Sequence, residues 1–212
     1  MSGQHRLTER LPLFAVLRGL EPERAVDVAE ALVSGGFQIL EVTMNSPDPI
    51  RSIAAIADRF SDRALVGAGT VTSAEQVEAI EAAGGRLIVS PHCDPALIAF
   101  ASSRGLAVLP GVLTPSEMFH ALAAGATGLK IFPAELVPPA GVRAVRAVLP
   151  EATPVYVVGG IHAGNMPDYL SAGATGFGLG SSLFKAGKAL DAIASDARAI
   201  VQAYQDARAA TA

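Results

Sequence analysis

Apolar runs of strand length alternate with alanine-rich segments of helix length along the whole chain. Eight runs are expected as strands: Leu13–Arg18, Ile39–Thr43, Leu65–Gly69, Leu87–Ser90, Ala107–Leu109, Gly128–Phe132, Val155–Gly159 and Gly176–Gly180. Such alternation is typical of one parallel sheet covered by helices. Eight strands favour an α/β fold of the closed (β/α)8 TIM barrel type. The alternative, a flavodoxin-like open sheet, would leave about three strands unexplained.

The segments between the runs are expected as helices with recognisable ends. They are Pro22–Ser34, Pro47–Arg59, Ser73–Ala83, Pro95–Arg104, Pro115–Ala124, Gly141–Val148, Asn165–Ala172 and Ala189–Arg208, and a short leading helix over Gly3–Arg10 is compatible with the pattern. Capping residues or early prolines mark several starts, as at Ser46-Pro47 and Asp94-Pro95. Glycine follows several helices, as at Gly84-Gly85, where it supplies a left-handed turn. Because the composition shows no break, residues 1–212 are expected to form a single domain.

Composition excludes several classes of partner. The 212 residues carry a formal net charge of −4, which gives no electrostatic reason to expect nucleic acid or an anionic membrane. No stretch approaches about 18 uninterrupted apolar residues, so no transmembrane helix or signal peptide is expected, and the predicted location is cytoplasmic. The single cysteine, Cys93, excludes an internal disulfide and a multi-cysteine metal site.

Lys130 lies within the apolar run Gly128–Phe132, where a buried strand would hold it away from water. An unpaired ammonium in such a place is costly, so the group must be paired, neutralised or used in chemistry. An apolar interior favours the neutral amine, which can attack a ketone and form a Schiff base without a metal. The alternatives are a lysine that pairs with a structural carboxylate or that binds phosphate.

Two further charged residues belong to the first two strands. Glu41 lies in the apolar run Ile39–Thr43 and could serve as a general acid and base, or it could neutralise Lys130 or Arg18 in a buried ion pair. Arg18 ends the first strand and could hold a carboxylate or phosphate in a bidentate fork, or form a salt bridge at the rim. Because barrel chemistry is placed at the C-terminal ends of strands, these side chains are expected to converge.

Two glycine-rich turns follow the last two strands. Gly159-Gly160 follows the seventh strand, and Gly178-Leu179-Gly180-Ser181-Ser182 ends the eighth. In many barrels these two loops bind phosphate through backbone N–H groups. The alternative is tight turn geometry alone. Since both turns occupy the expected strands, the pattern favours phosphate binding, with a serine hydroxyl as an additional donor.

Other polar residues at strand ends carry weaker indications. Thr70 follows the third strand and offers a hydroxyl to a substrate, or serves as a helix N-cap. His92 and Cys93 follow the fourth strand without a second ligand at suitable spacing, so no metal site is expected, and Cys93 is interpreted as a packing or surface thiol. His162 and Lys185 are expected at peripheral, solvated positions.

Seven motifs in order resemble those of the 2-keto-3-deoxy-6-phosphogluconate and -galactonate aldolases. They are Glu41-Val42-Thr43-x-Asn45-Ser46-Pro47, Gly67-Ala68-Gly69-Thr70-Val71, Leu87-Ile88-Val89-Ser90-Pro91-His92, Pro110-Gly111-x-x-Thr114-Pro115-Ser116-Glu117, Leu129-Lys130-Ile131-Phe132-Pro133, Val158-Gly159-Gly160 and Gly178-Leu179-Gly180-Ser181. The resemblance covers about Leu11 to Gly187, which is nearly the whole chain.

The resemblance implies a class I, metal-independent aldolase that needs no cofactor and is usually a homotrimer. Such an enzyme cleaves a phosphorylated keto-deoxy sugar acid to pyruvate and D-glyceraldehyde 3-phosphate. Carried over to the matching positions, Lys130 is the Schiff-base lysine and Glu41 is the proton donor and acceptor. Arg18, Thr70, Gly160, Gly180 and Ser181 correspond to substrate-binding positions, with the phosphate on the backbone N–H groups around Gly160 and Gly180-Ser181.

The choice of substrate depends on smaller features. The gluconate-type enzymes commonly carry an arginine and a threonine where this chain has Asn45-Ser46, and Leu129–Pro133 looks more like the galactonate branch. Ser90-Pro91, by contrast, looks like the gluconate branch. Since the first two features favour the galactonate branch, the expected substrate is 2-dehydro-3-deoxy-6-phospho-D-galactonate. The alternative is a 2-dehydro-3-deoxy-6-phosphogluconate/4-hydroxy-2-oxoglutarate aldolase, and the gluconate and galactonate forms differ only at C4.

Two other classes of function stay open at this stage. A phosphate-binding barrel isomerase or epimerase would use Glu41 to abstract a proton and Lys130 to stabilise an enolate. Many such epimerases use a metal held by His and Asp, and those ligands are missing from this sequence. A non-catalytic phosphosugar sensor or assembly subunit is the other alternative, although a binder would have no use for an amine held in an apolar strand.

Overall fold

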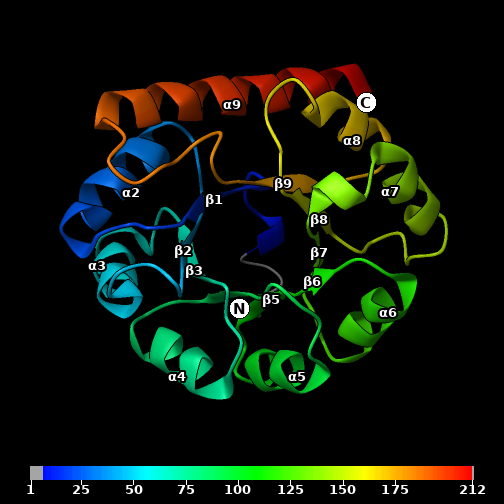
Figure 1. Cartoon of the computed structure of the whole chain (residues 1–212), viewed down its shortest axis with the longest axis horizontal. Coiled ribbons are helices and arrows are strands. Elements are labelled where there is room, and N and C mark those ends of the chain that lie inside the picture. Colours follow the sequence, from blue (N-terminus) through cyan, green and yellow to red (C-terminus); the bar gives the residue numbers. More distant parts are fainter. Residues whose placement is uncertain (1–6, 212) are drawn as a thin grey trace.

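The computed structural model describes residues 7–211 and contains a ring of parallel strands. The strands are β1 (Leu13–Leu17), β2 (Ile39–Thr43), β3 (Leu65–Gly69), β4 (Leu87–Val89), β5 (Ala107–Leu109), β6 (Gly111–Val112), β7 (Leu129–Ile131), β8 (Val155–Val158) and β9 (Gly176–Leu179). They are hydrogen-bonded in the order β5-β4-β3-β2-β1-β9-β8-β7-β6. Helices surround this ring on the outside (Figure 1).

The two ends of that order belong to one strand. Only Pro110 separates β5 from β6, and proline has no N–H to donate to a neighbouring strand. β5 pairs with β4 on one side and β6 pairs with β7 on the other, while the carbonyl of Pro110 accepts from Lys130 N at 3.0 Å. The strand Ala107–Val112 therefore closes the ring, and the predicted (β/α)8 barrel is confirmed.

The helices lie where the sequence pattern places them, to within three residues at either end. They are α2 (Ala25–Ser34), α3 (Pro49–Phe60), α4 (Ala74–Ala82), α5 (Pro95–Ser103), α6 (Pro115–Ala123), α7 (Pro139–Arg146), α8 (Met166–Ser171) and α9 (Leu190–Thr211), with 3-10 turns η1 (Pro22–Arg24) and η2 (Ala134–Leu136) before α2 and α7. Of the leading helix expected over Gly3–Arg10, Leu7 and Thr8 are helical, and residues 3–6 lie outside the described part.

Two helix starts differ from the expectation. α3 begins at Pro49 rather than Pro47, because Asp48 adopts a left-handed conformation with φ of 35° and Pro49 then occupies the first helical turn. α7 begins at Pro139 rather than Gly141, because here too a proline occupies the first helical turn. It ends at Arg146 rather than Val148. The capping residues elsewhere act as expected; for instance, the Asp94 carboxylate accepts the N–H groups at the start of α5.

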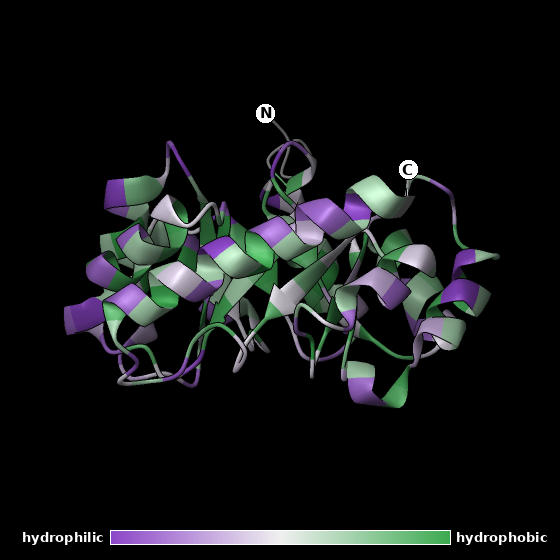
Figure 2. Ribbon diagram, turned by 90° about the horizontal axis from the view of Figure 1, so that it is seen from above, coloured by the Kyte–Doolittle hydropathy of each residue, from purple (hydrophilic) through white to green (hydrophobic). Residues whose placement is uncertain are grey.

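Apolar side chains form two layers. One cluster fills the space between the strands and the helices, and a second fills the interior of the barrel. In the interior, the rings of Phe14 and Tyr156 pack edge to face with centroids 5.8 Å apart. Figure 2 shows the helices with hydrophilic residues outside and hydrophobic residues toward the strands. Val16 and Val158 belong to the interior cluster and also line a cavity, so the cavity begins where the barrel core ends.

Candidate active site

A cavity of about 700 Å³ opens where the core ends, at the C-terminal ends of the strands. Its volume lies in the range of small-molecule sites, roughly 300–1,000 Å³. The lining residues come from strand ends and the loops that follow them: Val16, Arg18, Glu41, Thr70, Lys130, Phe132, Glu135, Val158, Gly159, Gly160, Ile161, His162, Gly178, Gly180, Ser181, Ser182, Phe184, Lys185 and Ala186. All seven residues predicted for the site are among them.

Lys130 lies on β7 at the floor of the cavity and is 6% exposed. Its Nζ has one weak hydrogen bond, 3.5 Å long, to the carbonyl of Ser90, and it lies 4.6 Å from the centre of the Phe132 ring. Burial lowers the pKa of the Lys130 ammonium, the nearby Glu41 carboxylate opposes that shift, and Arg18 adds to it. The net direction favours the neutral amine, which is the nucleophilic form.

Glu41 projects from β2 into the same floor and is 1% exposed. Burial raises the pKa of this carboxyl to about 7, against the opposing charges of Lys130 and Arg18. Its Oε2 has no hydrogen-bond partner, so the carboxylate is not fixed by a structural contact. A group that titrates near neutral pH and faces a cavity can both take and return protons.

Gly69 on β3 makes room for this carboxyl. A Cβ at Gly69 would lie 2.5 Å from Glu41 Oε1, so even an alanine would displace the acid. The sequence motif Gly67-Ala68-Gly69 contains this residue, but nothing in the motif alone indicates that the glycine faces the Glu41 carboxyl.

Lys130 and Glu41 do not form a direct ion pair among the described residues. Each shifts the pKa of the other through space, so both charges act within the cavity although the two side chains are not in contact. This argues against Glu41 serving only to neutralise Lys130, because a structural pair would bring the two charges into contact. The space between them is available to a substrate.

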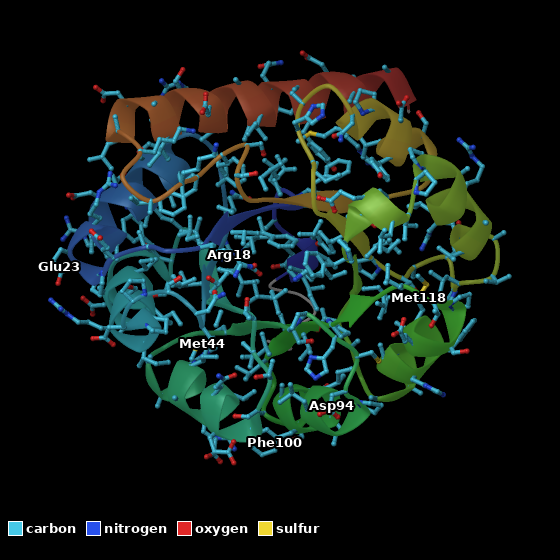
Figure 3. The ribbon with its side chains drawn as sticks, viewed as in Figure 1. Arg18, Glu23, Met44, Asp94, Phe100 and Met118 are labelled. Atoms are coloured by element: carbon cyan, nitrogen blue, oxygen red, sulfur yellow. The ribbon has the colours of Figure 1, made fainter. Side chains whose placement is uncertain are left out.

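Arg18 follows β1 and presents an exposed guanidinium to the cavity. Figure 3 shows it beside the barrel interior, whereas Glu23 lies at the outer rim. Its Nη1 donates to Asn45 Oδ1 at 2.8 Å, and it makes no salt bridge within residues 7–211. The rim salt bridge considered for Arg18 is therefore not found, and the remaining N–H groups can receive an anion.

Thr70 follows β3 and lines the cavity in a left-handed conformation with φ of 60°. Such a φ is strained for a β-branched residue, and strain of this kind is typical of functional sites. The N-cap of α4 is Ser73, whose side chain accepts from Gln76 N. The alternative role of Thr70 as a helix cap is therefore wrong, and its hydroxyl is free to face a ligand.

The opposite wall consists of the turns after β8 and β9. Gly159 and Gly160 have φ of 111° and 62°, conformations that favour glycine. In the described part of the chain, the backbone N–H groups of Gly160, Ser181 and Ser182 have no protein acceptor. Free donors on residues that line a cavity are suited to an anionic oxygen.

Side-chain contacts hold the two turns together. Ser182 Oγ donates to the carbonyl of Ile161 at 2.9 Å, which joins the turn after β9 to the turn after β8. Asn165 Nδ2 donates to the carbonyl of Gly160 at 3.0 Å, and Asn165 Oδ1 accepts from His162 N at 2.9 Å. The donor geometry is thus fixed before any ligand arrives.

Three cavity residues with ionisable side chains were not anticipated as site residues. Glu135 in η2 packs against Gly159 so closely that a Cβ there would overlap its carboxylate. His162 and Lys185, expected at peripheral positions, also line the cavity wall although they are exposed. Sequence patterns could not place them, because exposed turn residues follow no apolar period.

The fourth-strand residues lie elsewhere. His92 is exposed, and Cys93 Sγ donates to the carbonyl of Glu117 at 3.3 Å; burial raises the pKa of this thiol, and neither residue lines the cavity. Among the side chains described, no three His, Cys, Asp or Glu residues cluster closely enough to hold a metal ion. None of the helices in residues 7–211 has the length and apolar character needed to cross a membrane.

Comparison with known proteins shows which family the chain belongs to. Residues 5–201 match the family model described as KDPG and KHG aldolase. A Rhizobium meliloti protein named probable 2-dehydro-3-deoxy-6-phosphogalactonate aldolase is 47% identical over 193 residues, covering 91% of each chain. The Escherichia coli 2-dehydro-3-deoxy-6-phosphogalactonate aldolase is 43% identical over 198 residues, covering 93% of this chain and 97% of its own.

Solved structures agree with the sequence relatives. A structure described as native KDPGal superposes with a TM-score of 0.92 at 43% identity, covering 94% of this chain and 97% of the other. A KDPG aldolase from Legionella pneumophila, solved with pyruvate captured as a covalent carbinolamine intermediate, has a TM-score of 0.79 at 30% identity and covers 89% of this chain and 93% of its own. The chain therefore belongs to the KDPG and KHG aldolase family, whose members are lyases.

Proposed function

We propose that this protein is a class I aldolase that cleaves 2-dehydro-3-deoxy-6-phospho-D-galactonate to pyruvate and D-glyceraldehyde 3-phosphate. The names of the relatives at 43–47% identity support this substrate. The observation that carries the proposal is the joint position of Lys130 and Glu41 at the floor of a 700 Å³ cavity whose wall offers free backbone N–H groups. Amine, acid/base and anion site lie within one ligand-sized space.

The first step is covalent. Neutral Lys130 Nζ attacks the C2 carbonyl of the substrate, and the resulting carbinolamine loses water to give a protonated Schiff base. Burial supplies the neutral amine, because desolvation lowers the pKa of the Lys130 ammonium. Glu41, whose pKa is raised to about 7, can donate the proton that the departing water needs.

The second step breaks the C3–C4 bond. The Glu41 carboxylate takes the proton of the C4 hydroxyl, the C3–C4 electron pair moves toward the Schiff-base nitrogen, and D-glyceraldehyde 3-phosphate leaves as an aldehyde. Protonated Glu41 then returns a proton to C3 of the enamine. Addition of water to the protonated pyruvyl Schiff base releases pyruvate and the neutral Lys130 amine, and the proton freed in this hydrolysis returns to the Glu41 carboxylate, which closes the cycle.

The remaining predicted residues orient the two ends of the substrate. Arg18 and the Thr70 hydroxyl are proposed to contact the polar groups of the sugar acid, since both face the cavity beside Glu41. The N–H groups of Gly160, Gly180 and Ser181 are proposed to take the phosphate. Binding at the phosphate end would place C2 near Lys130 without direct participation of the phosphate in chemistry.

No metal is proposed to take part, because the protonated Schiff base itself withdraws electrons from the C3–C4 bond. The carbinolamine captured in the Legionella pneumophila relative supports covalent chemistry of this type. Activity in excess chelator is the expected result, whereas metal-dependent activity would favour the isomerase or epimerase alternative. The homotrimer stays a prediction from the family resemblance, and light scattering of the purified protein tests it. The cytoplasmic location stays a prediction from the sequence pattern.

The decisive assay measures pyruvate release from purified C4 epimers under identical conditions. We expect kcat/KM for the galactonate substrate to exceed that for the gluconate epimer, because the ratio reports differential binding of the two transition states. Preference for the gluconate epimer would replace the proposed substrate by the 2-dehydro-3-deoxy-6-phosphogluconate alternative. Tight binding of either compound with no product would support the sensor function instead.

A further inference from the structure

Asn45 and Ser46, on the loop between β2 and α3, hold Arg18 at three points. Ser46 Oγ accepts from Gly19 N at 3.0 Å and donates to the carbonyl of Leu17 at 3.3 Å, so it binds the backbone on both sides of Arg18. Asn45 Oδ1 accepts from Arg18 Nη1 at 2.8 Å. We call these two residues the Arg18 clamp.

The backbone half of the clamp is rigid. Ser46 Oγ also lies 3.0 Å from Thr43 Oγ1, and both hydroxyls are buried. Ser46 N donates to the carbonyl of Thr43 at 2.9 Å, which ties the loop to the end of β2, the strand that carries Glu41. The base of Arg18 is therefore fixed relative to Glu41, and only the long side chain needs further orientation.

The tip of Arg18 is held by a neutral group. The hydrogen bond to Asn45 is the one hydrogen bond of the guanidinium within the described residues, and no carboxylate forms a salt bridge with it. An aspartate of the same shape could accept the same hydrogen bond, but it would cancel the positive charge. The amide therefore restricts the conformations of Arg18 while leaving its full charge and its other N–H groups for an anion.

From this geometry we infer that Asn45 is a positioning residue, which orients the Arg18 guanidinium toward an anionic group of the substrate without neutralising it. The inference rests on the proposed function, since it needs an anionic sugar acid in the cavity. It extends that function by assigning a role in substrate affinity to a residue that does not itself line the cavity. Asn45 acts through Arg18, so its effect must disappear when Arg18 is removed.

The test compares Asn45→Ala with Asn45→Asp by steady-state kinetics on the galactonate substrate. Asn45→Ala frees the guanidinium and should raise KM about threefold, whereas Asn45→Asp neutralises it and should raise KM about tenfold or more. Both should change kcat by less than about threefold, because the contact serves binding. A purely structural role predicts the opposite order, with the isosteric Asn45→Asp close to wild type, and that order would overturn the inference.

Two controls isolate the mechanism. Ser116→Asp, at an exposed position in the first turn of α6 outside the cavity, adds the same charge and should leave KM unchanged. In an Arg18→Gln background, both Asn45 substitutions should change KM by less than about twofold, since the coupled partner is gone. Undiminished effects in that background would contradict the inference. Failure of wild-type protein to cleave the substrate would instead contradict the proposed function.

Discussion

The floor of the cavity, with Lys130 and Glu41, disfavours charged groups, whereas its rim, formed by the turns after β8 and β9, is suited to a bound anion. At the floor, Lys130 and Glu41 are 6% and 1% exposed. Burial lowers the pKa of Lys130 and raises the pKa of Glu41, and both shifts favour the neutral form of the group. At the rim, the turns Gly159–Gly160 and Gly180–Ser182 offer free N–H groups beside solvent. Under the proposed function, the floor serves proton transfer and covalent chemistry, and the rim binds the permanent charge of the phosphate. Substitutions at the floor should therefore change kcat and substitutions at the rim should change KM.

The largest expected effect is at the floor. Lys130→Arg keeps a cation but removes the amine nucleophile, because a guanidinium stays protonated at any accessible pH. We expect kcat to fall by about 10⁴-fold or more. Lys188→Arg is the matched control: its Nζ donates to the carbonyl of Leu183 and pairs with Asp196, contacts that a guanidinium can replace, and its activity should be unchanged. Substantial turnover by Lys130→Arg would show that the floor does not act through an amine.

Glu41→Gln should have the next largest effect. The amide keeps the shape of the side chain but cannot move a proton, so kcat should fall by about 10²- to 10⁴-fold. Since Schiff-base formation begins with protonated Glu41, the raised pKa of about 7 predicts that kcat/KM of the wild type decreases as the pH rises above neutrality and Glu41 loses its proton. Glu41→Gln should lose that dependence on Glu41. A pH profile that is the same in both proteins would remove Glu41 from the chemistry.

The same substitution should stabilise the fold at high pH. Since the folded protein binds the Glu41 proton more tightly than the unfolded chain does, the burial of Glu41 destabilises the fold as the pH rises from 4.5 through about 7. That difference corresponds to on the order of 3 kcal/mol. Glu41→Gln should therefore raise the free energy of unfolding in urea at pH 8 but hardly at pH 4.5. Glu78→Gln, an exposed carboxylate on α4, should change it by less than about 0.5 kcal/mol at either pH.

The rim should respond more weakly and in a different parameter. Gly160→Ala strains a residue with φ of 62°, and its Cβ would lie 3.2 Å from Glu135 Oε1, so the Glu135 side chain or the turn must move by a few tenths of an ångström. We expect KM to rise about tenfold with kcat within about threefold of wild type. Gly105→Ala has a similar φ of 74° and open space around its Cβ, so it imposes the strain without touching the rim. A loss of kcat in Gly160→Ala at unchanged KM would erase the distinction between floor and rim.

The sequence predicts the floor and the glycine turns of the rim, but it does not predict the charged residues beside those turns. Lys130 and Glu41 are conspicuous because a charge in a buried apolar strand breaks the pattern of its own element. The run Ala107–Leu109 is also predictable as a strand from its apolar character, but its continuation beyond Pro110 as β6 is not, because Pro-Gly is typical of a strand end. Glu135 does not interrupt an apolar pattern, because an exposed carboxylate in a short turn is common anywhere on a protein surface.

Ser46 shows why a local pattern can mislead. Ser-Pro before an apolar period indicates a helix start, yet the Ser46 hydroxyl contacts the backbone around Arg18 instead. α3 starts only after the left-handed Asp48. The competing contact comes from β1, 29 residues earlier in the chain for Leu17, and no rule based on neighbouring residues can include it. Tertiary contacts of this kind decide which polar side chains cap helices and which build sites.

The central claim is that Lys130 forms a Schiff base, and trapping tests it most directly. The protein is incubated with pyruvate, reduced with borohydride and mapped by peptide mass spectrometry. Because the chain contains three lysines, the site can be read without ambiguity. The account predicts one reduced pyruvyl adduct, on the peptide that contains Lys130, and none on Lys185 or Lys188. No adduct, or equal labelling of Lys185 and Lys188, would contradict it.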